Sequence, residues 1–534
     1  MKISPIVLRR AGVLTAGAAI ACVILRHFLA VHAGLEHFLD ADEAEYLHAG
    51  WLMHQGLRLY RDFAENHAPF LFVILKWMTP AGGSALFPRL DLITYLTRAR
   101  LFASVCGFLG LSAAAVVTYR AIRSLVAPLV MLAAMAASPW LWARRLVEVC
   151  NDPPTLFLFW LGALLLLGGW RAERLRFTLA GAGMGLVCIA FLWNPKWPLE
   201  SLVLGILYLS IAWRAWRQGV RSLFAAILPP FLCLGIALVC IAATAPLPDY
   251  YFFTFRFNRL LTAWIATSPY LTKLTEAAFH HGRAYMFCPP EFRGIWPILA
   301  VVLSIALLSM RAVRQRLGID GKILLVLLAL AVAATLEIRF IYPYPNVWTQ
   351  YYLMWSFIAA SLYGTTIAAL VRLMPSEGIR LFATAAVAIV AVSAVTEAMP
   401  AGAGPGGLPM LSYLQRKLQP GETVWMDHHP IGVRDASYYW FATKEFIPFS
   451  VQYTARHPGL TPLPNIAERD LPVCRAERGL QPDLRFVSGP LSLDLLPEAR
   501  ACLQRMIAQG RAVRTPAFDT WDLHPCGTLP GGCR

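Results

Sequence analysis

Residues 11–46 read AGVLTAGAAIACVILRHFLAVHAGLEHFLDADEAEY, and this stretch decides the fold. Its first part, 11–30, is an apolar run long enough to cross about 30 Å of hydrocarbon as a helix. Three basic residues precede the run, as in a signal peptide, but no clear Ala-x-Ala cleavage site follows it. We therefore expect an uncleaved first membrane span. It is followed closely by an acidic run with four carboxylates in six residues, Asp40–Glu45.

The apolar pattern continues along most of the chain. Of its 534 residues, 57% are hydrophobic and only 15% are charged, whereas soluble domains carry about 25% charged residues. The predicted fold class is a polytopic α-helical membrane protein with about eleven transmembrane helices. The runs of spanning length are 11–31, 100–119, 125–143, 154–170, 177–193, 197–213, 222–244, 293–310, 323–341, 350–371 and 381–398.

The basic residues predict the orientation of these spans. A formal net charge of +16 would suit a protein that binds nucleic acid, but Lys and Arg fall mainly in short loops between apolar runs. Such residues orient helices with the basic loops in the cytoplasm. With the N-terminus inside, the alternate loops hold Arg120 and Arg123; Arg171, Arg174 and Arg176; Arg214, Arg217 and Arg221; Arg311, Arg314, Arg316 and Lys322; Arg372 and Arg380. The acidic loop and everything beyond residue 400 then face the outer side.

The first outer loop, 32–99, is too long to be a simple connector. Residues 41–55 have helical periodicity, and Gly56 suits the position just past the end of a helix. After a break at Asn66-His67-Ala68-Pro69, residues 70–78 predict a second helix that is too short to span. We therefore expect two helices at the membrane interface in this loop.

A glycine- and proline-rich linker at 400–407 separates a transmembrane domain, 1–399, from a C-terminal domain, 400–534. Two helices and two short strands predict that the second domain is a small α/β domain outside the membrane. The helices are expected at 410–418 and 497–509 and the strands at 422–426 and 485–487.

Four cysteines of this domain suit an oxidising compartment and one or two disulfides, with three possible pairings. They are not spaced as Cys-x-x-Cys pairs, so zinc is not expected on them. They are Cys474, Cys502, Cys526 and Cys533.

Ionisable residues are almost absent from the middles of the predicted spans. The exceptions lie near outer ends: Glu200 beside Lys196, and Glu337 beside Arg339. Charges within a membrane usually mark an ion or substrate path, and transporters place theirs near the midplane. The pattern therefore favours a site at the outer interface over a channel or a transporter.

The acidic run has an ordinary interpretation and a functional one. Carboxylates in a first helical turn cap free N–H groups and complement the helix dipole, and Asp40 with Glu43 has the spacing of a capping box. Glu45 is expected at the surface or behind a functional group. The functional interpretation centres on Asp42 and Glu43, because polar motifs follow them in the outer loops.

These motifs are Asp42-Glu43-Ala44-Glu45-Tyr46, Gly56-Leu-Arg-Leu-Tyr60-Arg-Asp62-Phe63, Asn66-His67-Ala68-Pro69-Phe70, Asp152-Pro153 and the aromatic, proline-containing segment Tyr342–Tyr352. Together they resemble the GT-C superfamily of polytopic glycosyltransferases. The closest likeness is to the branch that includes protein O-mannosyltransferases, lipid A aminoarabinose transferases and bacterial galacturonosyl transferases. The second motif resembles that branch's G-x-x-x-Y-x-D-F pattern. The third resembles its H/K-P-P-L turn, with Ala68 in place of the first proline. The likeness covers about residues 10–370.

The resemblance implies a sugar donor linked to a polyprenyl phosphate and an acceptor hydroxyl that loses its proton as it attacks the anomeric carbon. A partly desolvated carboxylate near the bilayer can act as the base, because burial raises its pKa. We assign this role to Asp42. Glu43 is expected to orient Asp42 or the acceptor, and Asp152 to bind acceptor or sugar hydroxyls.

The leaving lipid phosphate needs positive charge at the interface. Four outer basic residues are candidates, and each has an alternative role as an interfacial residue that reaches toward the headgroups. Tyr46, His67 and Tyr351 complete the predicted substrate-binding set, with His67 either bonded to the donor or bracing the loop. The basic candidates are Lys196, Arg256, Arg259 and Arg339.

No cofactor is expected, except that dependence on a divalent cation stays open. Asp40-Ala-Asp42 has the Asp-x-Asp spelling with which some members of the superfamily hold a metal. Of the histidines in this region, only His48 and His54 share a predicted helix, and their six-residue spacing does not place them on one face.

The predicted function is a glycosyltransferase of a bacterial inner membrane. It would move one sugar from a polyprenyl-phosphate carrier to a lipid, glycan or protein acceptor of the cell envelope. A lipid or sugar transporter or flippase would require charges at mid-span. An O-antigen ligase or polymerase would centre on a large late loop. A membrane anchor for residues 400–534 would not need the acidic first loop.

Overall fold

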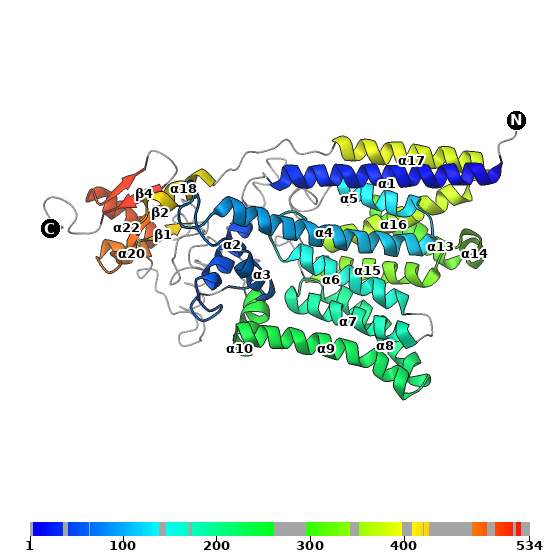
Figure 1. The fold of residues 1–534 in the computed structure, drawn as a ribbon, viewed down its shortest axis with the longest axis horizontal. Coiled ribbons are helices and arrows are strands. Elements are labelled where there is room, and N and C mark those ends of the chain that lie inside the picture. Colours follow the sequence, from blue (N-terminus) through cyan, green and yellow to red (C-terminus); the bar gives the residue numbers. More distant parts are fainter. Residues whose placement is uncertain are drawn as a thin grey trace. The chain divides into compact units, whose positions relative to one another are not determined.

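The computed structural model describes residues 4–35, 41–63, 65–137, 146–169, 174–260, 295–341, 352–397, 408–419, 421–426, 472–488, 497–515 and 520–524 (Figure 1). Contacts divide the chain into two compact units. The first unit comprises residues 1–36, 100–239 and 265–402, and the second comprises 37–99, 240–264 and 403–534. The two sequential domains expected from the sequence stay a prediction.

The first unit consists of apolar helices, and each of the eleven predicted spans contains one. Within the described residues, eight helices are long and apolar enough to cross a membrane. A helix pair bent by 98°, α13 and α14, would form a ninth span. The other two predicted spans, at 125–143 and 154–170, contain shorter apolar helices, α5 and α6. The bounds are α1 Pro5–Leu35, α4 Leu92–Ile122, α5 Val126–Ala136, α6 Asp152–Gly168, α7 Arg174–Trp193, α8 Pro198–Arg217, α9 Val220–Thr244, α13 Ile295–Ser309, α14 Arg311–Leu317, α15 Gly321–Phe340, α16 Leu353–Leu373 and α17 Glu377–Glu397.

Small residues allow helices of this unit to approach closely. A Cβ atom on Gly162 of α6 would lie 2.7 Å from the carbonyl oxygen of Gly183 in α7, and one on Gly183 would lie 2.6 Å from that of Gly162. Lipid tails are as apolar as the helices, so helix packing in a membrane depends on such close backbone contact. The α6–α7 pair is therefore closely packed, and it carries the polar residues at the start of α6 and just after α7.

The second unit begins with the first loop. Helix α2 spans Ala41–His54 and α3 spans Phe70–Met78, so both predicted loop helices are confirmed. They pack closely at Gly50, where a Cβ atom would lie 2.5 Å from that of Leu75. Gly56 follows α2 with φ +87°, a backbone conformation that glycine adopts without steric cost. The same unit contains α10, Leu247–Tyr251, and a π-helix, η2, Phe252–Phe257.

The C-terminal part of this unit has a four-stranded sheet of order β1-β2-β4-β3. Strands β1 and β2 are parallel, and the other pairs are antiparallel. The predicted helices and strands of this region are confirmed. Together with the apolar helices of the first unit they confirm the fold class, whereas the number of spans stays a prediction. The bounds are α18 Leu408–Lys417, β1 Thr423–Met426, α20 Pro472–Glu477, β2 Leu484–Ser488, α22 Pro497–Ala508, β3 Ala512–Arg514 and β4 Thr520–Leu523.

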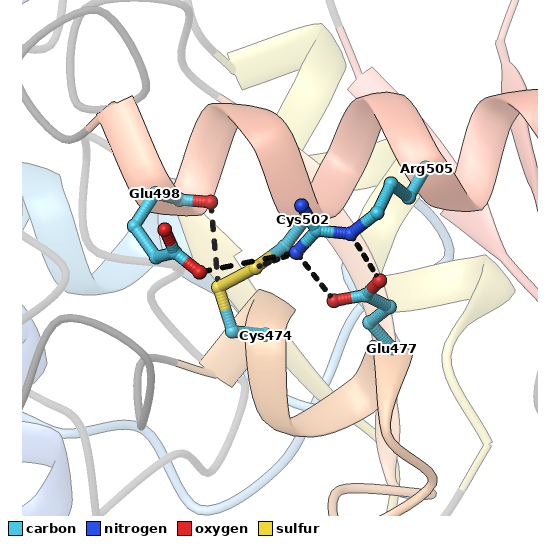
Figure 2. The surroundings of a disulfide bond; sticks show 5 residues. All are labelled: Cys474, Glu477, Glu498, Cys502 and Arg505. Carbon is cyan, nitrogen blue, oxygen red and sulfur yellow. Dashed lines mark hydrogen bonds and ion pairs between the residues drawn. A yellow bond between two sulfur atoms is a disulfide. The ribbon is translucent and has the colours of Figure 1, made fainter.

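A disulfide between Cys474 and Cys502 joins α20 to α22 (Figure 2). It is one of the pairings that the sequence left open. Beside it, the Arg505 guanidinium on α22 pairs with the Glu477 carboxylate on α20, so a covalent bond and an ion pair join the same two helices. Cys526 and Cys533 lie outside the described residues.

Candidate functional site

The first cluster of polar side chains lies in the second unit, where α2 meets the turn before α3. The Tyr46 Oη atom on α2 is 3.0 Å from Nε2 of His67, and Nδ1 of His67 is 2.7 Å from Oε1 of Glu65. The Glu65 side chain is fully buried, whereas 24% of the His67 side chain is exposed. A buried carboxylate therefore orients a partly accessible imidazole whose other nitrogen meets a phenol. We call Glu45, Tyr46, Glu65 and His67 the His67 cluster.

Hydrogen bonds from two other segments of the chain hold this turn in place. Asn66 Nδ2 donates to Oδ1 of Asn258 at 2.8 Å, and Asn258 Nδ2 donates back to the Asn66 carbonyl at 2.7 Å. Asn258 directly follows the π-helix η2, and π-helical segments often occur at functional sites. The Tyr60 hydroxyl donates to the His67 carbonyl. These bonds fix the turn on which Glu65 and His67 are presented.

Tyr60 itself has a strained backbone. Its φ of 65° is uncommon for any residue other than glycine. Its ring stacks on Phe253 of η2 with centroids 5.1 Å apart and planes 11° from parallel. Burial raises the pKa of the Tyr60 phenol, so the hydroxyl stays protonated and donates to the turn. The packing against η2 and this hydrogen bond hold the residue in its strained conformation.

The acidic run begins α2. Asp42 is the second residue of this helix, but its side chain and the whole of Asp40 lie outside the described part of the chain. Glu43 is buried, with 1% of its surface exposed, which suits the predicted role beside a catalytic group better than a solvated cap. Glu45 is half-buried. Its carboxylate lies in the His67 cluster, where one ligand atom each of Glu45, Glu65 and His67 are within 4.8 Å of one another.

The second cluster of polar side chains lies in the first unit, at the ends of apolar helices. Asp152, the first residue of α6, accepts hydrogen bonds on Oδ1 from Asn194 Nδ2 and from Lys196 Nζ, both at 2.9 Å. Asn151 Oδ1 accepts the indole N–H of Trp193 at 2.9 Å. Residues 194–197 follow α7 and precede α8, so this short loop delivers donors to the start of α6. We call these five residues the Asp152 cluster.

Several atoms in and beside this cluster are buried without a hydrogen-bond partner among the described residues. The second oxygen of Asp152, Oδ2, is one of them, although Asp152 is only 1% exposed. A buried polar atom left without a partner costs about 1–3 kcal/mol, so the set indicates a place where water or a ligand supplies the missing bonds. The others are Asn151 Nδ2, Trp197 Nε1 and Glu200 Oε2.

Two carboxyl groups meet nearby, where α8 begins and α15 ends. Glu200 and Glu337 are 1% and 2% exposed. The backbone N–H of Leu199 donates to Oε2 of Glu337 at 3.1 Å, so α8 contributes one of its free N-terminal donors.

The predicted phosphate-binding cations differ in their surroundings. The Lys196 ammonium is paired with Asp152, and 18% of its side chain is exposed. Arg256, Arg259 and Arg339 are exposed, and two of them lie over phenylalanine rings, at 5.9 Å for Arg256 over Phe252 and 5.7 Å for Arg339 over Phe340. Exposed guanidinium groups can bind an anion without breaking an ion pair. Tyr351 lies outside the described residues.

Sequence reasoning missed the residues that position the predicted ones. Glu65 was not singled out, although it lies two residues before His67 and its carboxylate orients that ring. The sequence pattern around Asn194 and Asn258 assigns neither of them a role. The one local signal in the sequence is the Glu65-Asn66-His67 run of polar residues inside an otherwise apolar turn.

Comparisons with known proteins found no matching family model and no matching curated protein. Among solved structures, the chain is similar to ArnT from Cupriavidus metallidurans bound to undecaprenyl phosphate, with a TM-score of 0.44, 13% identity, and coverage of 97% of this chain and 99% of that chain. It is also similar to ArnT of the same organism in the apo state, with a TM-score of 0.41, 15% identity, and coverage of 90% and 94%. At these identities and scores, neither match assigns a site or an activity to this chain.

Proposed function

We propose that the chain is a membrane glycosyltransferase that moves one sugar from a polyprenyl-phosphate carrier to an acceptor of the cell envelope. The reaction would take place at the outer face of a bacterial inner membrane, where the positions of the arginines in the loops would put both Asp42 and Asp152. The chain would need a donor lipid, an acceptor hydroxyl and a bilayer, and no nucleic acid.

The observation that carries this proposal is the Asp152 cluster. Carboxylate, amide and ammonium groups converge at the ends of apolar helices, and Asp152 Oδ2 is buried without a partner among the described residues. A sugar hydroxyl both donates and accepts hydrogen bonds, so it can donate a hydrogen bond to this oxygen and accept one from a neighbouring N–H. Asp152 would thereby bind a sugar or acceptor hydroxyl, with Lys196 holding it in place.

The first loop would supply the chemistry. In the proposed reaction Asp42 removes the proton of the acceptor hydroxyl as the bond to the anomeric carbon forms and the bond to the phosphate oxygen breaks. A well-placed general base accelerates such a step by about 10²–10⁴-fold. Glu43, buried next to Asp42 on α2, would orient the base or the acceptor. Tyr46 and His67 would contact the donor.

The departing phosphate would be stabilised by basic side chains. Arg256, Arg259 and Arg339 are exposed and keep their N–H groups accessible to an anion. Lys196 donates one of its three N–H groups to Asp152, so its positive charge is already shared with that carboxylate. A phosphate oxygen could contact Lys196 only in addition to this ion pair. We therefore favour the arginines over Lys196 as the primary phosphate ligands.

The test is a transfer assay with purified protein. Donors are a panel of polyprenyl-phosphate hexoses, pentoses and aminopentoses, the acceptor is an envelope extract, and release of polyprenyl phosphate is measured. We expect wild-type turnover with at least one donor. Asp42→Asn should lower kcat at least 100-fold. Asp152→Asn should mainly raise KM, because it removes a binding contact that is present before the transition state.

Asp320→Asn is the matched control. Asp320 caps α15 through its side chain, and asparagine is as good an N-cap as aspartate, so this variant should be as active as wild type. Each variant must elute as a monodisperse species. Failure of wild type to transfer from any donor, or full activity of Asp42→Asn, would contradict the proposal.

A further inference from the structure

We propose that Glu45, Glu65 and His67 form a binding site for one divalent transition-metal ion of the zinc class. This site is distinct from Asp40-Ala-Asp42, the pair that the sequence suggested for a metal. It does not depend on the proposed transferase function, because metal content can be measured without any substrate.

The first argument is the chemistry of the ligand set. Carboxylate oxygens and imidazole nitrogens are both ligands that Zn²⁺ takes in proteins, and catalytic zinc sites have three protein ligands and one open position. The three ligand atoms lie within 4.8 Å of one another without any ion between them. Around a tetrahedral ion with bonds of about 2.1 Å, ligand atoms are about 3.4 Å apart. Side-chain shifts of about 1 Å would therefore close the site.

The second argument is the position of the carboxylates. Glu65 has a fully buried side chain, and Glu45 is half-buried. Solvated carboxylates often cluster without any ion, but carboxylates removed from water repel one another strongly, and each needs charge compensation. A divalent cation between the three groups would add two positive charges next to both carboxylates.

The third argument is the arrangement around the ligands. A metal-bound histidine usually donates its other ring N–H to an outer partner, which fixes the ring. Here Nδ1 of His67 faces Glu65 at 2.7 Å, and Nε2 faces the Tyr46 oxygen at 3.0 Å. With an ion bound on the Nδ1 side, the Nε2–H group would donate to Tyr46. The metal would replace the proton now shared by His67 and Glu65, and this contact would widen by about 0.7 Å to reach the tetrahedral spacing.

The backbone of the site is already fixed. Oε1 of Glu65 accepts the Asn66 N–H at 2.8 Å, and the Asn66 side chain is bonded to Asn258. Glu45 comes from the middle of α2, so a helix and a pinned turn supply all three ligands. Because the chain supplies three ligands, a tetrahedral ion would keep an exchangeable fourth position for water or a substrate oxygen, as in catalytic rather than structural zinc sites.

The test uses the full chain purified in detergent with a tag that contains no histidine. Bound metal is removed with dipicolinate, the chelator is removed, and Zn²⁺ is titrated while heat release and final metal content are measured. We expect one equivalent of Zn²⁺ per chain. Glu65→Gln and His67→Asn should each weaken binding at least 100-fold. Tyr46→Phe should weaken it about 10–100-fold, the range found for outer-shell partners.

Asp62→Asn is the matched control, because Asp62 is an exposed carboxylate of the same loop outside the ligand set. It should bind Zn²⁺ as wild type does. Since a ligand variant can fail to fold, the Co²⁺ form of wild type provides a second measurement, and its visible absorption should report a tetrahedral site with nitrogen and oxygen ligands. Uptake of less than a tenth of an equivalent by wild type would overturn the proposal. So would normal binding by Glu65→Gln, or loss of the ion in Asp42→Asn but not in Glu65→Gln.

Discussion

Removing one partner of the Asp152–Lys196 ion pair should destabilise the first unit more than removing both. The two side chains meet at 2.9 Å, with Asp152 1% exposed and Lys196 18% exposed. Ion pairs on a protein surface contribute about 0–1 kcal/mol, but this pair is largely removed from water. In such surroundings the loss of one partner leaves a buried charge uncompensated, which costs about 3–5 kcal/mol.

The two single variants should not be equivalent. Lys196→Met leaves the Asp152 carboxylate buried, with Asn194 as its remaining donor, so we expect a loss near the upper end, about 4–5 kcal/mol. Asp152→Asn leaves an ammonium that can turn toward solvent through its exposed fraction, and the new amide can still accept from Asn194. We expect this variant to lose about 2–3 kcal/mol. The double variant carries no charge, and we expect it to lose about 1–2 kcal/mol.

The assay is the apparent unfolding temperature of detergent-purified protein, followed by intrinsic fluorescence. A multi-pass protein of this size does not unfold in two states, so the order of the four temperatures is the quantity compared, not absolute free energies. The expected order is wild type, double variant, Asp152→Asn, Lys196→Met. If the effects of the two single variants simply add in the double variant, the two side chains are not coupled and the reasoning is wrong.

Two further predictions concern the second unit. Burial lowers the pKa of His48 on α2 to about 3, so the folded chain keeps this imidazole neutral, while an unfolded chain takes up a proton below its ordinary pKa of about 6.5. The contribution of the neutral His48 to the free energy of unfolding is therefore complete above about pH 6.5 and falls by about 1.4 kcal/mol on going to pH 5.5. The unfolding temperature of His48→Gln should drop less than that of wild type between pH 7.5 and 5.5. An equal drop would contradict this assignment. Reduction of Cys474–Cys502, which closes a loop with a sequence separation of 28, should cost the C-terminal region about 3.6 kcal/mol by loop-closure entropy. Trypsin should then cleave faster between residues 472 and 515, and unchanged cleavage would show that the ion pair of Arg505 with Glu477 holds these helices without the disulfide.

The helices could be predicted from the sequence because their signals are local. Each apolar run contains a helix, and α3 begins and ends at the residues that the pattern indicated, Phe70 and Met78. Two of the four C-terminal strands, β1 and β2, were also predictable, since Val424 and Phe486 are apolar residues in short runs and are both buried in the core of this region. In each case one stretch of chain carries both the propensity and the reason for burial.

The clusters could not be predicted in the same way, because their partners are far apart in the sequence. Asp152 and Lys196 are separated by 44 residues, and Asn66 and Asn258 by 192. The loop that holds Glu65 has no helical or strand period, so nothing in its pattern shows that this carboxylate is buried or that it turns toward His67. The prediction of Lys196 as a phosphate ligand stays untested, and nothing in its own loop shows that the Asp152 carboxylate pairs with it.

The position of the buried charges in the first unit follows from the cost of placing them in an apolar environment. Asp152 opens α6 and Glu200 lies in the first turn of α8, where free N–H groups and the helix dipole favour negative charge. Glu337 lies at the unfavourable end of its own helix, α15, but it accepts the N–H of Leu199 from the start of α8. The ends of α6 and α8 therefore stabilise carboxylates that the middles of the same helices could not hold. Because the helices fix these groups before any substrate arrives, a bound sugar would find its hydrogen-bond partners in place, and the ordering cost would be met during folding instead of during binding. A variant that weakens substrate binding at Asp152 should therefore also lower stability, whereas a flexible surface site would separate the two effects.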